Sequence, residues 1–204
     1  MDPTWKHPFT ATVAGPTSCG KTVFTFRLIE HAKEMISPEP EKIIWCYGVY
    51  QDMFDRYPNI EFHEGVPNLS MFDGKLRTLL VLDDLMQETD DRVVQIFTKI
   101  SHHKNLSVLY LTQNLFYKNK QSRTISLNSH FLIIFKNTRD ITQIAILARQ
   151  MYTGKYKFMV EAFNDATSGP YGYLVVDLRP QIDESLRLRT NIFPGETCYV
   201  YVRK

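Results

Sequence analysis

Blocks of consecutive apolar residues alternate along the chain with segments in which apolar residues recur every three or four positions. The first pattern is typical of strands buried on both faces, and the second of helices with one buried side. One helical segment, for example, carries Val93, Ile96 and Ile100 on a single face. The pattern predicts strands over residues 9–14, 42–48, 60–63, 79–84, 106–111, 130–135 and 171–178, and helices over 23–36, 51–57, 90–104, 141–151 and 156–166. Because strands and helices alternate, we expect an α/β fold with a mostly parallel central sheet covered by helices on both faces.

The last part of the chain has a different pattern. Leu186 and Leu188 alternate with Arg187 and Arg189, and a Pro-Gly turn then leads into a second apolar run. This predicts a hairpin with one polar face that carries the arginines. We expect the extension 185–204 to serve assembly or docking more than catalysis, although a hairpin that merely widens the sheet fits the pattern equally well.

Composition sets broad limits on the protein. The 204 residues are enough for one α/β domain, so we expect a single domain spanning residues 1–204, and 44% of the residues are hydrophobic. No apolar run approaches the ~20 residues of a membrane helix, and the first residues lack the apolar core of a signal peptide. The three cysteines lack metal-ligand spacing, and a net charge of +2 does not mark a nucleic-acid binder. These features predict an intracellular protein without a membrane partner, whose contacts with DNA would come from local patches.

A glycine-rich motif lies between the first predicted strand and the first predicted helix, where residues 15–22 match G-x-x-x-x-G-K-[ST], the phosphate-binding loop. Gly15 and Gly20 let the backbone turn its N–H groups toward phosphate oxygens, and the helix adds the positive end of its dipole. We expect Lys21 to contact the β- and γ-phosphates of ATP and the Thr22 hydroxyl to bind Mg²⁺. The residues predicted to bind the nucleotide are Gly15, Pro16, Thr17, Ser18, Cys19, Gly20, Lys21, Thr22 and Val23.

Two further strand ends carry polar residues suited to ATP hydrolysis. Asp83 and Asp84 follow four apolar residues, as in a Walker B element, so Asp83 is a predicted Mg²⁺ ligand beside Thr22. Asp84 is a candidate for orienting and polarising the attacking water, with a turn or capping aspartate as the alternative. Gln113 follows a later strand that, in P-loop ATPases with this extra strand, lies between the loop strand and the Walker B strand. We therefore predict that Gln113 faces the γ-phosphate, the alternative being a solvated turn residue.

Together with the motif at Gly15–Thr22, three other segments resemble the FtsK/HerA-type packaging ATPases. These segments are Leu82-Asp83-Asp84, Leu109–Asn114 and Phe135–Asp140. The nearest resemblance is to the packaging ATPases of Maverick/Polinton elements and adintoviruses, relatives of the poxvirus packaging ATPase. It covers nearly the whole chain, including the tail at Arg187–Pro194. The superfamily usually carries Asp-Glu at Walker B, whereas this chain has Asp-Asp, so that Asp84 would act through a repositioned water.

The resemblance implies a P-loop NTPase three-layer sandwich that hydrolyses ATP with Mg²⁺. It also implies a homo-oligomeric ring motor that pumps double-stranded DNA into a preformed capsid, with a capsid or portal-vertex protein as its partner. Such a motor would act in the host cell during virus assembly, in the nucleus or in the virion.

A ring ATPase usually receives an arginine at the γ-phosphate from the neighbouring subunit. Arg123 is expected at the end of a loop just before the strand that begins near residue 125, and Arg139 follows that strand as the second candidate. Each could instead be a solvated or salt-bridged arginine. The basic and aromatic segment 116–123 could line a pore and touch DNA phosphates, or could be an ordinary solvated loop.

Two other functional classes remain open at this point. A small P-loop nucleotide kinase would need an arginine-rich lid, and the chain shows no such cluster. A GTP-binding regulatory module would need the guanine-reading Asn-Lys-x-Asp motif, which Asn137-Thr138-Arg139-Asp140 resembles except for a threonine in place of lysine. The Asp-x-x-Gly sequence of such modules is also missing after Asp83.

Overall fold

The computed structural model describes residues 4–85, 91–116 and 120–203. The predicted helix start at Asp90 and the centre of the basic segment, Tyr117-Lys118-Asn119, lie outside the described residues. No helix in the described ranges is long and apolar enough to cross a membrane.

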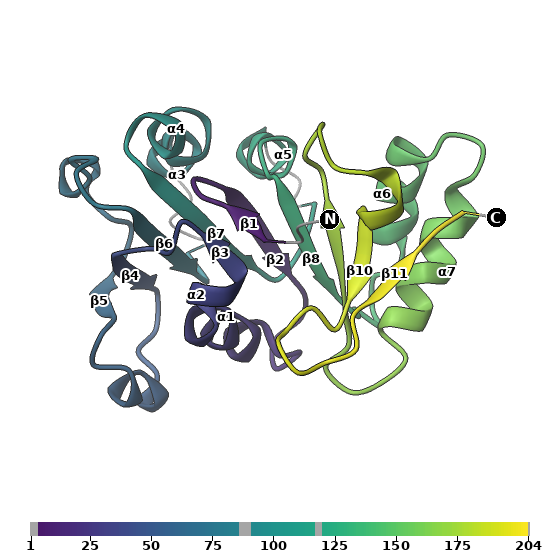
Figure 1. Cartoon of the computed structure of the whole chain (residues 1–204), viewed down its shortest axis with the longest axis horizontal. Helices are drawn as coiled ribbons and strands as arrows, with labels where there is room; N and C mark the ends of the chain where they lie inside the picture. The colour runs from purple at the N-terminus through teal and green to yellow at the C-terminus, as the bar shows by residue number, and fades with distance from the viewer. Residues whose placement is uncertain (1–3, 86–90, 117–119, 204) are drawn as a thin grey trace.

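A nine-stranded sheet forms the centre of the molecule, in the order β11-β10-β9-β8-β2-β7-β6-β4-β5 (Figure 1). The strands are β2 (Thr10–Ala14), β4 (Lys42–Tyr47), β5 (Glu61–Glu64), β6 (Thr78–Asp83), β7 (Leu106–Thr112), β8 (Phe131–Phe135), β9 (Tyr173–Asp177), β10 (Leu188–Thr190) and β11 (Tyr199–Tyr201). The pairs from β8 to β5 are parallel, and the pairs β8–β9, β9–β10 and β10–β11 are antiparallel. A separate two-stranded sheet pairs β1 (Trp5–Lys6) with β3 (Ile36–Ser37). The expected mostly parallel sheet is confirmed.

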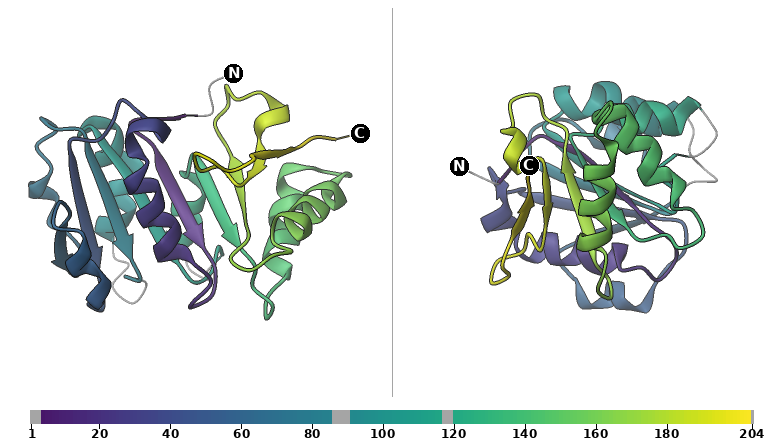
Figure 2. Two further views of the ribbon diagram at one scale, coloured as in Figure 1. Left: turned by 60° about the horizontal axis from the view of Figure 1, so that its bottom comes forward. Right: turned by 90° about the vertical axis from the view of Figure 1, so that its right-hand side faces the viewer.

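Helices cover both faces of this sheet, as the right-hand view of Figure 2 shows. On one face α1 (Lys21–Glu30) and α2 (Ala32–Met35) pack with the 3₁₀ helix η1 (Asp52–Arg56). The other face carries α3 (Asp91–Gln95), the π-helical turn η4 (Ile96–Ile100), α4 (Ser101–His103), α5 (Lys120–Leu127), α6 (Thr142–Met151) and α7 (Tyr156–Ala166). Two short 3₁₀ helices, η2 (Leu69–Met71) and η5 (Glu184–Leu186), lie in connecting segments. The predicted three-layer sandwich is confirmed.

The core follows the alternation of side chains along the strands. Val13, Val81 and Leu109 point toward α1, whose Phe26 stacks on Trp45 at a centroid distance of 4.5 Å. The opposite side chains of the same strands meet the helices of the other face. Because both faces are covered, the strands read as continuous apolar runs rather than as alternating ones.

Three expected elements differ from the structure. The helix predicted over 23–36 begins at Lys21, breaks at His31 and ends in strand β3. The helix predicted to reach Lys104 contains the π-helical turn η4. The loop expected to hold Arg123 is helix α5, which the pattern missed because few of its side chains are apolar and buried.

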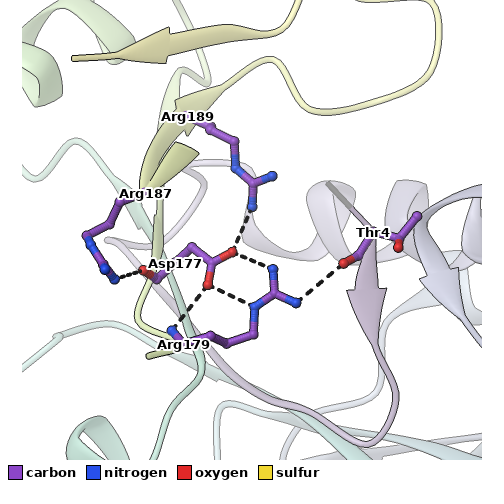
Figure 3. A network of polar contacts seen from close by, with 5 residues as sticks. All are labelled: Thr4, Asp177, Arg179, Arg187 and Arg189. Atoms are coloured by element: carbon purple, nitrogen blue, oxygen red, sulfur yellow. Dashed lines mark hydrogen bonds and ion pairs between the residues drawn. The ribbon is translucent and has the colours of Figure 1, made fainter. Parts of the chain in front are cut away.

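The hairpin β10–β11 extends the sheet beside β9, and its arginines do not form a solvated face (Figure 3). Arg189 is only 2% exposed, and its guanidinium binds the fully buried carboxylate of Asp177 at 3.1 Å. Arg179 binds the same carboxylate through two hydrogen bonds of 2.9 and 2.7 Å, and Arg187 donates to the Asp177 carbonyl at 2.6 Å. The prediction that Arg189 lies on an outer polar face of the hairpin is therefore wrong, because the Asp177 carboxylate on β9 binds its guanidinium inside the protein.

Candidate functional site

The phosphate-loop motif connects the carboxyl end of β2 to the first turn of α1. The Gly15 N–H donates to the Thr112 carbonyl at 3.1 Å, which ties the loop to β7. A Cβ at Gly15 would lie 2.6 Å from Cys19 Sγ and 2.7 Å from Phe135 Cβ, so no larger residue fits there. Gly20 has φ +108°, a conformation that favours glycine. Both motif glycines are thus required by the shape of the backbone.

Lys21 closes over this loop. Its Nζ donates to the carbonyls of Gly15 at 2.8 Å and of Pro16 at 3.0 Å. The first turn of α1 carries no acidic side chain, and Gly20 provides no side-chain cap for its N–H groups. The loop therefore offers a cation and uncapped amides to an anion, as phosphate binding requires.

Asp83 lies at the carboxyl end of β6 with its carboxylate buried. Its Oδ2 has no hydrogen-bond partner among the described residues. Burial, and secondly the charge of Asp84, raise the pKa of the Asp83 carboxyl to about 6, against the opposing effects of the Lys21 charge and of the Trp45 side chain. A buried carboxylate oxygen without a partner suits a cation, because a positive charge would offset its desolvation.

The donor set at this position suits Mg²⁺. The Asp83 carboxylate and the Thr22 hydroxyl are the hard oxygen ligands that Mg²⁺ prefers. The described ranges contain no cluster of three or more His, Cys, Asp or Glu side chains that could hold a metal ion. A site with one or two protein oxygens agrees with Mg²⁺ bound mainly by phosphate and water.

Asp84 and Gln113 come together although they are 29 positions apart in the sequence. They follow the neighbouring strands β6 and β7, and Gln113 Nε2 donates to Asp84 Oδ1 at 3.5 Å. Both side chains are exposed, and Asp84 has φ 53°, in the left-handed region that aspartate tolerates better than most residues. The structure thus places Asp84, the predicted water-orienting group, beside Gln113, which is predicted to face the γ-phosphate.

Sequence analysis missed a polar cluster behind this pair, centred on Gln143 of α6. Gln143 Oε1 accepts from the Leu115 N–H at 2.8 Å, and Gln143 Nε2 donates to Asn114 Oδ1 at 3.2 Å and to Asp140 Oδ2 at 2.7 Å. Asp140 also accepts from the backbone N–H of Thr142 at 3.2 Å. Hydrogen bonds from Thr142 and Gln143 lower the pKa of the Asp140 carboxyl. Asp140 therefore stabilises the start of α6. This structural role explains an aspartate at the position that resembles the guanine-reading aspartate of GTP-binding modules.

The two candidate arginines occupy different elements. Arg123 lies on α5 and Arg139 on the loop that follows β8, and both side chains are exposed. Within the described ranges neither guanidinium forms an ion pair, while the Arg139 backbone N–H donates to Asn137 Oδ1 at 3.1 Å. Among the described residues neither guanidinium hydrogen-bonds to the phosphate loop, and Asn137 and Asp140, on either side of Arg139, line a small pocket with Gly15.

The described part of the basic segment is half-buried or helical. Phe116 is half-buried against the cluster of α6, α7 and β8 to β10, and residues from Lys120 onward belong to α5. Of the two alternatives for residues 116–123, the ordinary solvated loop is therefore wrong for the described part, and the contact with DNA stays a prediction.

Comparison with known proteins identifies the fold of this chain from similar solved structures. No family model and no curated protein matches the sequence. The genome packaging NTPase B204 from Sulfolobus turreted icosahedral virus 2, in complex with ATP-gammaS, is similar with a TM-score of 0.54 at 13% identity, over 96% of this chain and 98% of that chain. The same protein in complex with sulfate gives 0.52 at 12% identity, over 100% and 98%. With the phosphate-loop geometry, this similarity shows that the chain has the P-loop NTPase fold.

Proposed function

We propose that this protein is a Mg²⁺-dependent ATPase of the FtsK/HerA type that packages double-stranded DNA into a viral capsid. The observation that carries the proposal is the strand order β2-β7-β6, which aligns the phosphate loop, Gln113 and Asp84 along one edge. The fold similarity to a viral genome packaging NTPase supports the choice of packaging over other ATPase tasks. The motor would act as a homo-oligomeric ring in the host cell, in contact with a capsid or portal-vertex protein.

Each side chain has a role that follows from its position. Lys21 would exchange the carbonyls of Gly15 and Pro16 for phosphate oxygens, and the α1 amides would bind further oxygens. Asp83 and Thr22 would hold Mg²⁺, which when bound neutralises phosphate charge. Asp84 would accept a proton from the attacking water. Gln113 would hold the Asp84 carboxylate in position through its hydrogen bond and would also contact that water. An arginine would complete the charge around the γ-phosphate, as Arg123 or Arg139 of a neighbouring subunit.

The test compares ATP hydrolysis in the wild-type protein, Lys21→Ala and Asp84→Asn, with and without double-stranded DNA. Lys33→Ala, an exposed lysine on α2, is the matched control and should hydrolyse ATP normally. Lys21→Ala should lose nucleotide binding and activity. Asp84→Asn should bind ATP but hydrolyse it ~10²–10⁴-fold more slowly, the usual contribution of a positioned base.

Three outcomes would contradict the proposal. Hydrolysis in Lys21→Ala at the wild-type rate would reject the phosphate site. A loss of threefold or less in Asp84→Asn would mean that another group orients the water. Phosphate transfer to nucleoside monophosphates, with no stimulation by DNA, would favour a nucleotide kinase instead.

A further inference from the structure

A second pocket adjoins the phosphate loop on the side of α1, and none of the roles above uses it. It has a volume of about 240 Å³ and shares Gly20 and Val23 with the loop and the helix. Pockets that hold a whole drug-sized ligand measure about 300–1,000 Å³. This pocket is therefore suited to one part of a nucleotide rather than to all of it.

Aromatic side chains form the inner wall of this pocket. Phe24 of α1 contacts Tyr173 at a centroid distance of 4.9 Å and Phe193 at 5.1 Å. The guanidinium of Arg27 lies 4.0 Å above the Phe193 ring and binds Glu196 at 2.7 Å. The one charged side chain in the wall is thus already paired, and the surface left for a ligand is flat and apolar.

Tyr171 stands at the mouth of the pocket in an unusual conformation. It has φ 58° and is 72% exposed, in a turn closed by a 3.2 Å bond from the Gly172 N–H to the Gly169 carbonyl. Glycine and asparagine are the residues favoured at this position of such a turn, because other side chains are strained there. A Cβ at Gly20 would lie 3.4 Å from the Tyr171 ring, so the ring borders the phosphate loop.

The turn has no room to move away from the loop. A Cβ on Gly172 would lie 2.5 Å from the Ala166 carbonyl oxygen and 2.9 Å from the Thr167 Cα, at the end of α7. The close backbone contact at Gly172 fixes Tyr171 in front of Gly20. An exposed aromatic ring held in a strained turn beside a phosphate loop calls for a functional explanation.

On the other face of the loop, the described residues form a much smaller pocket. This pocket, lined by Gly15, Gln113 and Asn137, has a volume of only about 20 Å³, close to the space that one water molecule needs. Of these two pockets, the one on the α1 side is therefore the better place for the planar ring of a nucleotide whose phosphates occupy the loop.

We propose that Tyr171 and the aromatic pocket behind it hold the base of the bound nucleotide, an inference that rests on the proposed ATPase function. The base stacks on the Tyr171 ring while the apolar wall formed by Phe24, Tyr173 and Phe193 excludes water from its other side. Every base has a flat face, and the one charged side chain among the described residues of the wall, Arg27, is already paired with Glu196. Adenine and guanine nucleotides should therefore bind with similar affinity.

The experiment measures the affinity of the full chain for ATP and for inorganic tripolyphosphate, which has no base. Tyr171→Asn should weaken ATP binding roughly 5- to 150-fold, the range of one base–aromatic stacking interaction, and leave tripolyphosphate binding unchanged. Its melting temperature should be no lower than that of the wild type, because asparagine tolerates the positive φ. Tyr171→Phe keeps the ring and should bind ATP within about twofold of the wild type on the same grounds. Tyr199→Asn, on the exposed strand β11, is the matched control and should change neither affinity.

The outcomes separate this inference from the function on which it rests. If Tyr171→Asn binds ATP as the wild type does, or loses ATP and tripolyphosphate equally, Tyr171 does not hold the base. If the wild-type protein binds neither ligand, the phosphate site itself is rejected and the base pocket with it. A strong preference for either purine would show that a group outside this wall reads the base edge.

Discussion

Asp83 is a buried carboxylate whose Oδ2 lacks a hydrogen-bond partner among the described residues. The rise of its pKa from 3.8 to about 6 corresponds to about 3 kcal/mol. The raised pKa means that the folded state disfavours the ionised carboxylate. The free energy of unfolding is therefore lowered by this full amount at pH values above about 6, where Asp83 is ionised in the folded protein. In the protein without a cation this position therefore lowers stability, a cost that the proposed Mg²⁺ would offset.

Replacing this carboxylate should therefore stabilise the protein that has neither metal nor nucleotide. We expect Asp83→Asn to raise the free energy of unfolding by about 1–2 kcal/mol at pH 7.5, since a neutral amide loses less on burial than a carboxylate. The same variant should lose Mg²⁺-dependent hydrolysis. Urea unfolding in the presence of a chelator measures the first effect, with the exposed Asp52→Asn as a control that should change stability by less than about 0.5 kcal/mol. A destabilised Asp83→Asn protein would mean that the carboxylate has a favourable partner without metal.

At the scale of single residues, the sequence predicted the groups that belong to contiguous motifs. The phosphate loop and the Asp83-Asp84 pair each lie within a few positions, so local pattern was sufficient. Tyr171 and Gln143 could not be found in this way, because their significance comes from Gly20 and Leu115, far away in the sequence. Arg189 was misjudged for the same reason, since only the pairing of β9 with β10 reveals its carboxylate partner.

Asp177 joins three segments at the edge of the sheet opposite the phosphate loop. Its carboxylate binds Arg179 and Arg189, and Arg179 reaches the Thr4 carbonyl at 3.5 Å (Figure 3). This cluster attaches the C-terminal hairpin to β9 and to the N-terminal segment. The hairpin is therefore an integral part of the sheet, and its role in assembly stays a prediction.

Removing the charge of Asp177 should leave two buried guanidinium groups without their shared carboxylate. We expect Asp177→Asn to lower the free energy of unfolding by about 3–5 kcal/mol, as when one partner of a buried ion pair is removed. The control is Glu184→Gln, which removes the more exposed partner of Arg187 and should change stability by about 0–1 kcal/mol. Urea unfolding compares the two. An effect of Asp177→Asn no larger than that of the control would show that the cluster contributes little to the fold.

Gln143 connects α6 to the loop that follows β7. Two of its hydrogen bonds hold Asn114 and Leu115, the residues directly after Gln113, and a third joins it to Asp140. It does not itself reach Asp84, so we regard it as a positioning residue for the Gln113 side chain. Small displacements of groups around a reacting centre can lower a rate by as much as ~10²-fold.

Gln143→Leu should therefore slow ATP hydrolysis by about tenfold or more while leaving the affinity for ATP unchanged. Gln150→Leu, an exposed glutamine at the end of the same helix, is the matched control and should retain the wild-type rate. Single-turnover hydrolysis and equilibrium ATP binding separate the two effects. If Gln143→Leu weakens binding as much as it slows hydrolysis, the cluster supports the whole site and not Gln113 in particular.

At the scale of elements, the strands were the most predictable part. The strands β2, β6, β7, β8 and β9 are buried on both faces and therefore stand out as apolar runs, whereas β5 and β11 at the two edges are largely exposed. Helix α5 was missed because its surface is largely polar, and the π-helical turn η4 has no signature in the apolar spacing. The break between α1 and α2 also left no trace in the pattern, because Ala32 and Met35 continue the apolar face of the helix.

For the whole molecule, the order of the sheet was predictable only in part. The insertion of β7 between β2 and β6 was expected from the strand order of P-loop ATPases that have this extra strand, and it is confirmed. The extension of the sheet by β9, β10 and β11 is antiparallel and could not be read from strand patterns alone. Neither candidate guanidinium hydrogen-bonds to the phosphate loop within the described ranges, so we propose that a neighbouring chain supplies the group that completes the ATP site.

Arg123 is our first candidate for that group. It is exposed on α5 and has no ion pair within the described ranges, so its guanidinium is available to a neighbouring subunit. An arginine supplied in trans contributes ~10³–10⁵ in rate by stabilising the charge of the transferring phosphoryl group. We therefore expect activity to rise steeply with protein concentration, or on DNA that gathers the subunits into a ring.

The decisive measurement mixes two inactive proteins. The Arg123→Ala protein keeps an intact phosphate loop, and the Lys21→Ala protein keeps Arg123. Each alone should be nearly inactive, whereas mixed rings should recover part of the activity at interfaces that combine the two intact halves. Arg56→Ala, an exposed arginine on η1, is the control and should be active without mixing. If mixed rings form and remain as inactive as their components, Arg123 is not the arginine supplied in trans, and the same mixture with Arg139→Ala tests the second candidate.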